Sequence, residues 1–381
     1  MTPASSPAPS LADHAPRIAA LAGEHAVRSE AARTPHPDVI DAVVAAGFAA
    51  HFVPPPFGDP ARTFTELKRA AAVIGAECPA TAWCAVLATL MARTAGHLPP
   101  EGQKRLWGKG PDTLIAGGVT PRGNASPTEG GWTLSGSWPS VTAAEHADWL
   151  LLTGVVHEGG TAGPRVFVVP RSAARVEKTW DDIGMQATGS HTVAVDEVFV
   201  EEPMTFPLAL LAEVDDPRPG HDDRPVPLLA VNTLLFCLPM LGAARGVLRR
   251  WTRSVGDKLH ERQGEFDPLV AHYADVFARS SSELDAAELV LDRVARLVDT
   301  AERVDRADVA RNQRDCAFAA GLLVDAVDRL MRASGSSGHS TGRALQRLWR
   351  DIHTAGAHMA LQFGPAAAQY AREFLRSDTA Q

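Results

Sequence analysis

Apolar side chains recur at three- and four-residue spacing along the first part of the chain. Residues 39–44 carry one such set, which is typical of one face of a helix. Residues 63–66 are Thr-Phe-Thr-Glu, a capping-box sequence that predicts the start of another helix. Residues 79–91 are apolar on nearly all sides, as expected for a helix surrounded by protein. We therefore expect an N-terminal helical domain over residues 11–111.

Short β-rich runs replace the helical spacing near residue 112. Residues 149–156, 165–170 and 191–200 are rich in apolar and β-branched side chains, and Gly and Pro turns separate them. This pattern predicts a small, mostly antiparallel β domain over residues 112–206.

Helical spacing returns after a connector rich in Pro and Asp, which we place at residues 207–226. Leu284, Leu291 and Val298 fall seven residues apart, as on the buried face of an antiparallel bundle over residues 227–381. The predicted fold class is α+β, with an N-terminal helical domain, a central antiparallel β module and a C-terminal antiparallel helical bundle. This order of elements argues against a Rossmann or barrel chain.

Composition narrows the choice of partners and compartment. With 381 residues, 45% of them hydrophobic, the chain can bury two or three cooperating cores, and its net charge of −8 offers no general attraction to nucleic acid or anionic lipid. Residues 1–10 are rich in Pro, Ala and Ser, so we expect a disordered lead rather than a signal peptide. Residues 226–244 are apolar but interrupted by polar and Pro residues, which favours a buried helix over a membrane span. We expect a cytoplasmic protein without a metal site, in which four dispersed thiols stay reduced: Cys78, Cys84, Cys237 and Cys316.

Short motifs stand in a fixed order along the chain. The clearest are Glu-Cys-Pro-Ala-Thr-Ala-Trp at 77–83, Gly-Ser-Trp-Pro-Ser-Val-Thr at 136–142 and Leu-Gln-Arg-Leu-Trp-Arg-Asp at 345–351; others lie at 35–54, 145–149 and 179–190. Together they resemble the acyl-CoA dehydrogenase superfold, and more closely its two-component, group D branch of flavin-dependent monooxygenases. The resemblance covers nearly all of the chain after the lead.

Within this superfold, the position of the base separates two kinds of enzyme. Many acyl-CoA dehydrogenases have a Glu at a fixed distance after the Arg-Asp pair, and counting from Arg350 and Asp351 that position holds Met359. A thioether cannot accept the proton. The monooxygenase branch has a His in the turn where this chain has His353, which is our candidate base, with His358 as the alternative.

The resemblance also implies a set of site residues. Thr142 would accept a hydrogen bond from flavin N5, although the family usually has two Ser and a Gly where this chain has Val141, Thr142 and Ala143. The implied flavin contacts are Trp138, Thr142, Thr188, Ser190 and Arg262, the last of these reaching the flavin phosphate of a neighbouring subunit. The implied substrate pocket includes Trp83, His358 and Met359.

The function that the resemblance implies is oxygenation of a small molecule. Reduced FMN or FAD would come from a separate reductase, react with O2 to give a C4a-hydroperoxyflavin, and hydroxylate an aromatic, phenolic or amine substrate in a biosynthetic or catabolic pathway. The family is commonly tetrameric through its C-terminal bundle. Two alternatives remain open from the sequence: an acyl-CoA dehydrogenase-like FAD oxidoreductase, and a non-catalytic oligomeric binding module.

Overall fold

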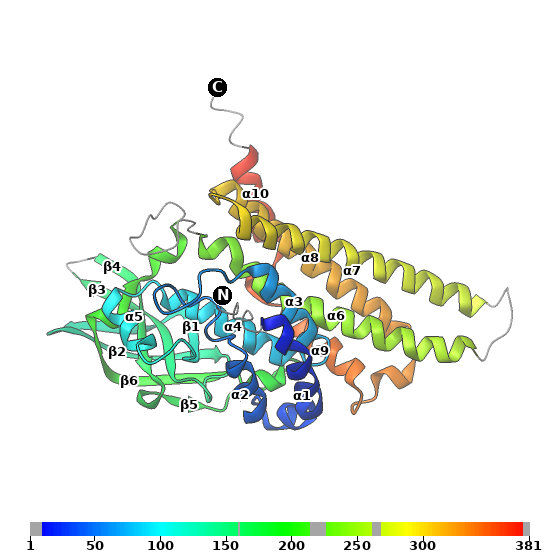
Figure 1. Ribbon diagram of the computed structural model, residues 1–381, viewed down its shortest axis with the longest axis horizontal. Helices are drawn as coiled ribbons and strands as arrows, with labels where there is room; N and C mark the ends of the chain where they lie inside the picture. The colour runs from blue at the N-terminus through cyan, green and yellow to red at the C-terminus, as the bar shows by residue number, and fades with distance from the viewer. Residues whose placement is uncertain (1–9, 159–160, 214–225, 261–267, 376–381) are drawn as a thin grey trace, which may run out of the picture.

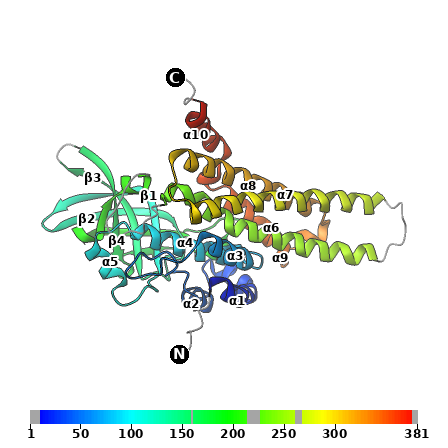
Figure 2. The same ribbon diagram turned by 45° about the horizontal axis from the view of Figure 1, so that its top comes forward.

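The computed structural model describes residues 10–158, 161–213, 226–260 and 268–375. A seven-stranded sheet lies at one end of the molecule, and the long helices of the C-terminal half extend away from it at the other (Figure 1). The N-terminal helices pack along the junction between these two parts, an arrangement that a second view also shows (Figure 2).

The N-terminal region is helical, as the apolar spacing predicts. Its helices are α1 (Leu11–Ala32), α2 (Pro37–Ala45), α3 (Phe64–Gly75), α4 (Pro79–Ala95) and α5 (Pro100–Trp107). The all-apolar stretch forms α4, and nearly every residue of this helix is buried, which confirms the prediction of a helix enclosed by protein.

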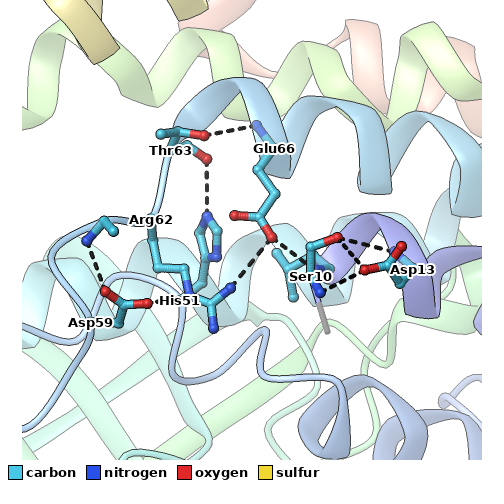
Figure 3. A network of polar contacts seen from close by, with 9 residues as sticks. Ser10, Asp13, His51, Asp59, Arg62, Thr63 and Glu66 are labelled. Atoms are coloured by element: carbon cyan, nitrogen blue, oxygen red, sulfur yellow. Dashed lines mark hydrogen bonds and ion pairs between the residues drawn. The ribbon is translucent and has the colours of Figure 1, made fainter. Parts of the chain in front are cut away.

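Only half of the predicted capping box forms at the start of α3. The side chain of Thr63 accepts a hydrogen bond from the backbone N–H of Glu66 at 3.1 Å, as expected for an N-cap. The Glu66 carboxylate, however, accepts the backbone N–H of Leu11 at 2.8 Å and pairs with Arg62 (Figure 3). Glu66 therefore ties the start of α3 to the start of α1, which the sequence pattern did not predict.

One sheet contains all seven strands, in the order β5-β6-β2-β1-β3-β4-β7. The strands are β1 (Ile115–Thr128), β2 (Gly131–Val141), β3 (Trp149–Glu158), β4 (Thr161–Pro170), β5 (Arg175–Glu177), β6 (His191–Glu201) and β7 (Thr205–Pro207). All pairs are antiparallel except β1 with β3, so the prediction of a mostly antiparallel module is confirmed. The three apolar runs form β3, β4 and β6, whereas β1 was not predicted.

The C-terminal half forms the predicted antiparallel bundle. Its helices are α6 (Leu228–His260), α7 (Pro268–Thr300), α8 (Arg306–Arg332), α9 (Ala344–Gly356) and α10 (Phe363–Leu375). Leu284, Leu291 and Val298 are all buried on α7, as the heptad spacing predicts. By length and composition α6 could cross a membrane, but 78% of its apolar window is buried inside the molecule, as in a core helix.

Two predicted segments are only partly covered by the described residues. Residues 1–9 of the expected disordered lead lie outside them, and Ser10 belongs to α1 as its N-cap. Of the expected linker at 207–226, Leu208–Ala212 forms a short 3-10 helix, η4, and residues 214–225 lie outside the described part. All four cysteines are buried free thiols, in agreement with their interpretation as packing residues.

Candidate functional site

A cavity of about 1140 Å³ lies where the sheet, the N-terminal helices and the bundle meet. Its wall is mostly apolar and includes residues of α4, β1, β2, η4, α6 and the end of α9, together with the loop that precedes β6. Single-ligand pockets commonly measure about 300–1,000 Å³. The volume therefore accommodates more than one small molecule.

A chain of three hydroxyl groups lines one wall of this cavity. Thr188 Oγ1 donates to the Met185 carbonyl at 2.8 Å, lies 2.7 Å from Ser190 Oγ, and Ser190 Oγ lies 2.9 Å from Thr142 Oγ1. A hydroxyl has one proton, and that of Thr188 is used on Met185. Ser190 must therefore donate to Thr188, and Thr142 to Ser190. Thr142 is left with lone pairs only, so it can accept a hydrogen bond from a ligand.

Backbone strain flanks this hydroxyl chain. Met185 and Ala143 adopt the left-handed conformation with φ of 53° and 54°, which typically costs about 1–3 kcal/mol for a residue other than glycine. Two hydrogen bonds hold them there: the Met185 N–H donates to Asp351 Oδ1 at 2.6 Å, and the Ala143 N–H donates to the Thr188 carbonyl at 3.0 Å. The surrounding structure thus fixes the positions of the hydroxyl groups.

Two tryptophans line the cavity in different ways. Trp138 is almost fully buried, its Nε1 donates to the Thr153 carbonyl at 2.8 Å, and glycines of β1 and β2 pack against its indole. Trp180 is only partly buried, and its Nε1 donates to the Met185 carbonyl at 3.0 Å. Trp180 can cover a planar ligand, whereas Trp138 meets the cavity wall as a core residue that is only 1% exposed.

The two candidate histidines both line the cavity, but their ring nitrogens have opposite roles. His353 Nε2 lies 2.9 Å from Asp328 Oδ1 and donates to it, which leaves Nδ1 as the acceptor. His358 Nδ1 accepts the Ala360 N–H at 3.2 Å, which leaves the proton on Nε2 when the ring is neutral. Desolvation by surrounding protein atoms lowers the pKa of His358, although its ring remains open to the cavity.

Aromatic side chains surround His358. Its ring lies 4.1 Å from Phe236 and 5.9 Å from Trp83, measured between centroids, and Trp83 stacks on Phe236 at 5.2 Å. The structure therefore places Trp83 and His358 next to each other in the wall of the cavity. Phe236, which completes the group, was not singled out from the sequence because it lies within a long apolar helix.

One other residue of the implied site does not line the cavity, and another lies outside the described residues. Met359 is 76% exposed and is not among the residues that line it, so its place in the substrate pocket is corrected. Its position in the short 3-10 helix η6 (Met359–Leu361) turns it outward, whereas the preceding His358 turns inward. Arg262 lies outside the described residues.

One group of possible metal ligands lies elsewhere, on α1 and at the start of α2. His25, His36 and Asp38 place one ligand atom each within 4.8 Å of the others. The two imidazoles are stacked, however, with centroids 3.8 Å apart and planes inclined by 19°. Lone pairs in parallel ring planes do not converge on one ion, so this geometry does not suit a tetrahedral metal site.

The residues around the cavity fit a reduced flavin. A reduced isoalloxazine is a planar, largely apolar ring with a protonated N5, and it needs an apolar slot and an acceptor at that atom. Thr142, the end of the hydroxyl chain, supplies the acceptor, and Trp180 supplies aromatic surface. This cavity and the helical and β parts around it meet what a flavoprotein oxidoreductase of the acyl-CoA dehydrogenase type requires.

Comparison with known proteins shows which enzymes the chain is similar to in sequence. Residues 234–363 match the family model described as acyl-CoA dehydrogenase, C-terminal domain. A pigment production hydroxylase of Rhodococcus sp. (strain ATCC 21145) is 28% identical over 95% of both chains. The flavin-dependent monooxygenase oxygenase subunit HsaA of Rhodococcus jostii (strain RHA1) is 27% identical over 88% of this chain and 91% of its own. The oxygenase component of the FADH2-dependent resorcinol hydroxylase of Rhizobium sp. (strain MTP-10005) is 27% identical over 94% and 92%.

Solved structures agree with this placement at the level of the fold. The 3-HSA hydroxylase of Rhodococcus sp. RHA1 superposes with a TM-score of 0.88 at 24% identity, covering 97% of this chain and 98% of its own. XiaF from Streptomyces sp., solved with FADH2, gives a TM-score of 0.87 at 24% identity, covering 96% and 95%. The chain is therefore similar in sequence, over most of its length, to oxygenase components of flavin-dependent monooxygenases, and its fold is that of the acyl-CoA dehydrogenase superfold.

Proposed function

We propose that this protein is the oxygenase component of a two-component monooxygenase that hydroxylates a small phenolic compound. The observation that carries the proposal is a single apolar cavity that contains both a hydroxyl chain ending in an acceptor at Thr142 and a histidine, His353, whose acceptor nitrogen is left free by a carboxylate. Reduced FMN or FAD, when bound, supplies the electrons that activate O2 for transfer of one oxygen atom to the substrate.

Thr142 and the apolar walls have the protective role in this proposal. Thr142 would accept a hydrogen bond from flavin N5–H and so hold that proton in place. The apolar lining from α4, β1 and α6 would exclude the water that otherwise promotes release of hydrogen peroxide.

His353 is the proposed base. Its Nδ1 would accept the proton of the substrate hydroxyl, which raises the electron density of the aromatic ring at the carbon that takes the oxygen. His358, with its proton on Nε2, would donate a hydrogen bond within the same cavity. A phenol is favoured over an amine because the relatives include a resorcinol hydroxylase and an indole-3-acetate monooxygenase, both named for aromatic substrates.

The dehydrogenase alternative has less support. The only carboxylate among the described residues that line the cavity is Asp182, which is exposed on the loop before β6. The position where many dehydrogenases have their Glu is Met359, whose exposed side chain neither faces the cavity nor accepts a proton.

The remaining parts of the proposal concern assembly and location. We propose a cytoplasmic homotetramer that receives reduced flavin from a separate reductase, with Arg262 of one subunit contacting the flavin phosphate of another. Exposed aromatic residues on α8 and α10 support burial of this face against a further subunit: Phe318 and Phe363 contact each other at 6.3 Å between centroids and are 51% and 49% exposed.

A direct assay tests the proposed function. The purified protein is mixed anaerobically with reduced FMN or reduced FAD and then with O2 and a simple phenol such as resorcinol, and products are separated by chromatography. We expect a hydroxylated product that depends on the protein, on reduced flavin and on O2. A series of phenols that all leave the assay with hydrogen peroxide alone would contradict the proposal.

A further inference from the structure

We propose that Asp328 is the positioning residue that holds His353 in the form of a base. This inference rests on the proposed function and adds a residue to its site. Asp328 does not line the cavity; it belongs to α8 and lies behind His353, at a separate surface hollow of about 430 Å³.

One carboxylate oxygen of Asp328 accepts two hydrogen bonds from α9. Trp349 Nε1 donates to Oδ1 at 2.7 Å, and His353 Nε2 lies 2.9 Å from the same atom. The other oxygen, Oδ2, pairs with Arg332 at 3.2 Å. Trp349 and His353 also contact each other edge to face, with centroids 5.0 Å apart. Two neighbouring residues of the cavity-lining helix are thus fixed by one side chain of the bundle.

These contacts keep Asp328 ionised. An indole N–H can only donate, so Oδ1 must be an acceptor. Partial burial tends to raise the pKa of Asp328, but the hydrogen bonds from Trp349 and His353 and the charge of Arg332 outweigh it and hold the pKa below its ordinary value. Other titratable groups around the hollow are Asp325, Arg329 and His272.

An ionised Asp328 selects one tautomer of His353. Because the carboxylate can only accept, the neutral imidazole must carry its proton on Nε2, and Nδ1 becomes the basic atom. When the substrate hydroxyl transfers its proton, the O–H bond breaks, the Nδ1–H bond forms, and the resulting imidazolium lies against a negative charge. The same arrangement makes a histidine an efficient base in other enzymes.

The chain provides a matched control on the same helix. Asp325 lies one turn before Asp328 and lines the same hollow, but within the described residues no hydrogen bond joins it to His353. Asp328→Asn should lower kcat for hydroxylation about 10- to 100-fold with little change in the KM for the phenol, whereas Asp325→Asn should leave both unchanged. Equal kinetics for Asp328→Asn and wild type would overturn the proposal.

Chemical rescue separates a role in proton transfer from a role in folding. Since Asp328 borders a surface hollow, formate can reach the space that Asp328→Ala creates. We expect formate to restore part of the lost kcat in Asp328→Ala and to have no effect on wild type or Asp325→Ala. Loss of activity that formate does not restore, in a variant with wild-type circular dichroism, would count against the proposal.

The assay also distinguishes this inference from the function on which it rests. If wild type forms no hydroxylated product from any phenol, the proposed function fails. If wild type forms product and Asp328→Asn forms it at the same rate, the function stands and the role of Asp328 is refuted.

Discussion

His353 and His358 are five residues apart, and their hydrogen bonds give them complementary chemistry. Asp328 accepts a hydrogen bond from Nε2–H of His353, whereas Nδ1 of His358 accepts one from the Ala360 N–H. Since desolvation lowers the pKa of His358, this ring is neutral at neutral pH and acts as a donor through Nε2. At the scale of single residues, one histidine is therefore suited to accept a proton and the other to offer a hydrogen bond.

Removal of the proposed base should uncouple the reaction. In His353→Ala we expect product formation to fall about 100-fold, because the phenol keeps its proton, while reduced flavin is still oxidised and hydrogen peroxide accumulates. Product and peroxide are measured in the same samples. His146→Ala is the control, because His146 bonds Thr34 outside the cavity. An unchanged product yield in His353→Ala would remove this residue from its role.

Removal of the Thr142 hydroxyl, the acceptor at the end of the hydroxyl chain, should raise the yield of hydrogen peroxide even without substrate. Thr142→Val keeps the shape of the side chain but cannot accept a hydrogen bond, so we expect more hydrogen peroxide per reduced flavin with or without substrate. Thr153→Val is the matched control, because the buried Thr153 hydroxyl has no hydrogen-bond partner in the described part of the chain. Identical peroxide yields in the two variants would show that Thr142 does not protect the bound oxygen.

At the scale of elements, strands β1 and β2 depend on glycine to accommodate Trp138. A Cβ at Gly118 would lie 2.9 Å from Trp138 Cβ, and a Cβ at Gly123 or Gly136 would overlap the indole ring. The same glycines obscure β1 in the sequence, because glycine is depleted in strands. The glycines that make β1 hard to recognise in the sequence are thus the residues that let the Trp138 indole pack closely on the strand.

An added methyl group on this contact should weaken the fold. Gly123→Ala should lower the free energy of unfolding by about 1–3 kcal/mol, because Trp138 must move out of a tightly packed position. Gly163→Ala on β4 is the control, since nothing lies within 4 Å of a Cβ there. Urea unfolding followed by tryptophan fluorescence measures both. Equal stability of the two variants would contradict the packing argument.

At the scale of the whole molecule, the Arg350-Asp351 pair joins the bundle to the β module. Asp351 accepts the Met185 N–H, and Arg350 donates to the Ile183 carbonyl and pairs with Glu30 of α1. Burial raises the pKa of Asp351 from 3.8 to about 6, and its bond from Met185 and the charge of Arg350 only partly oppose this. The loop that carries the hydroxyl chain is therefore held by a helix of the opposite half.

The raised pKa of Asp351 predicts how stability changes with pH. Between 3.8 and about 6 the folded protein holds a proton on Asp351 that the unfolded chain has released, so this residue makes stability fall as the pH rises through that window. Asp351→Asn can still accept the Met185 N–H but does not titrate. We expect the variant to gain stability over wild type at about pH 7 and to lose that advantage at about pH 4.5, as measured by urea midpoints. A difference that does not vary with pH would contradict the prediction.

Much of the architecture could be predicted from local patterns. Apolar spacing located the helices of both halves, the buried α4 and the stripe of Leu284, Leu291 and Val298, because these patterns reflect the periodicity of the elements themselves. The order of the motifs indicated the superfold, and the resemblance implied Thr142, Thr188 and Ser190 as flavin contacts. The direction of their hydrogen bonds was not predicted, since it depends on the local turn that brings the Met185 carbonyl, three residues earlier, to the Thr188 hydroxyl.

The sequence by itself determined the order of helical and β regions and the types of residue available for flavin chemistry, because short-range periodicity and motif spacing are properties of the chain. The tertiary structure alone decided which of these residues share a cavity. It turned Met359 outward, set Phe236 and Trp83 against His358, and placed Asp328 behind His353 from 25 residues away in the chain. Such contacts follow from the packing of whole helices, and no local pattern encodes them.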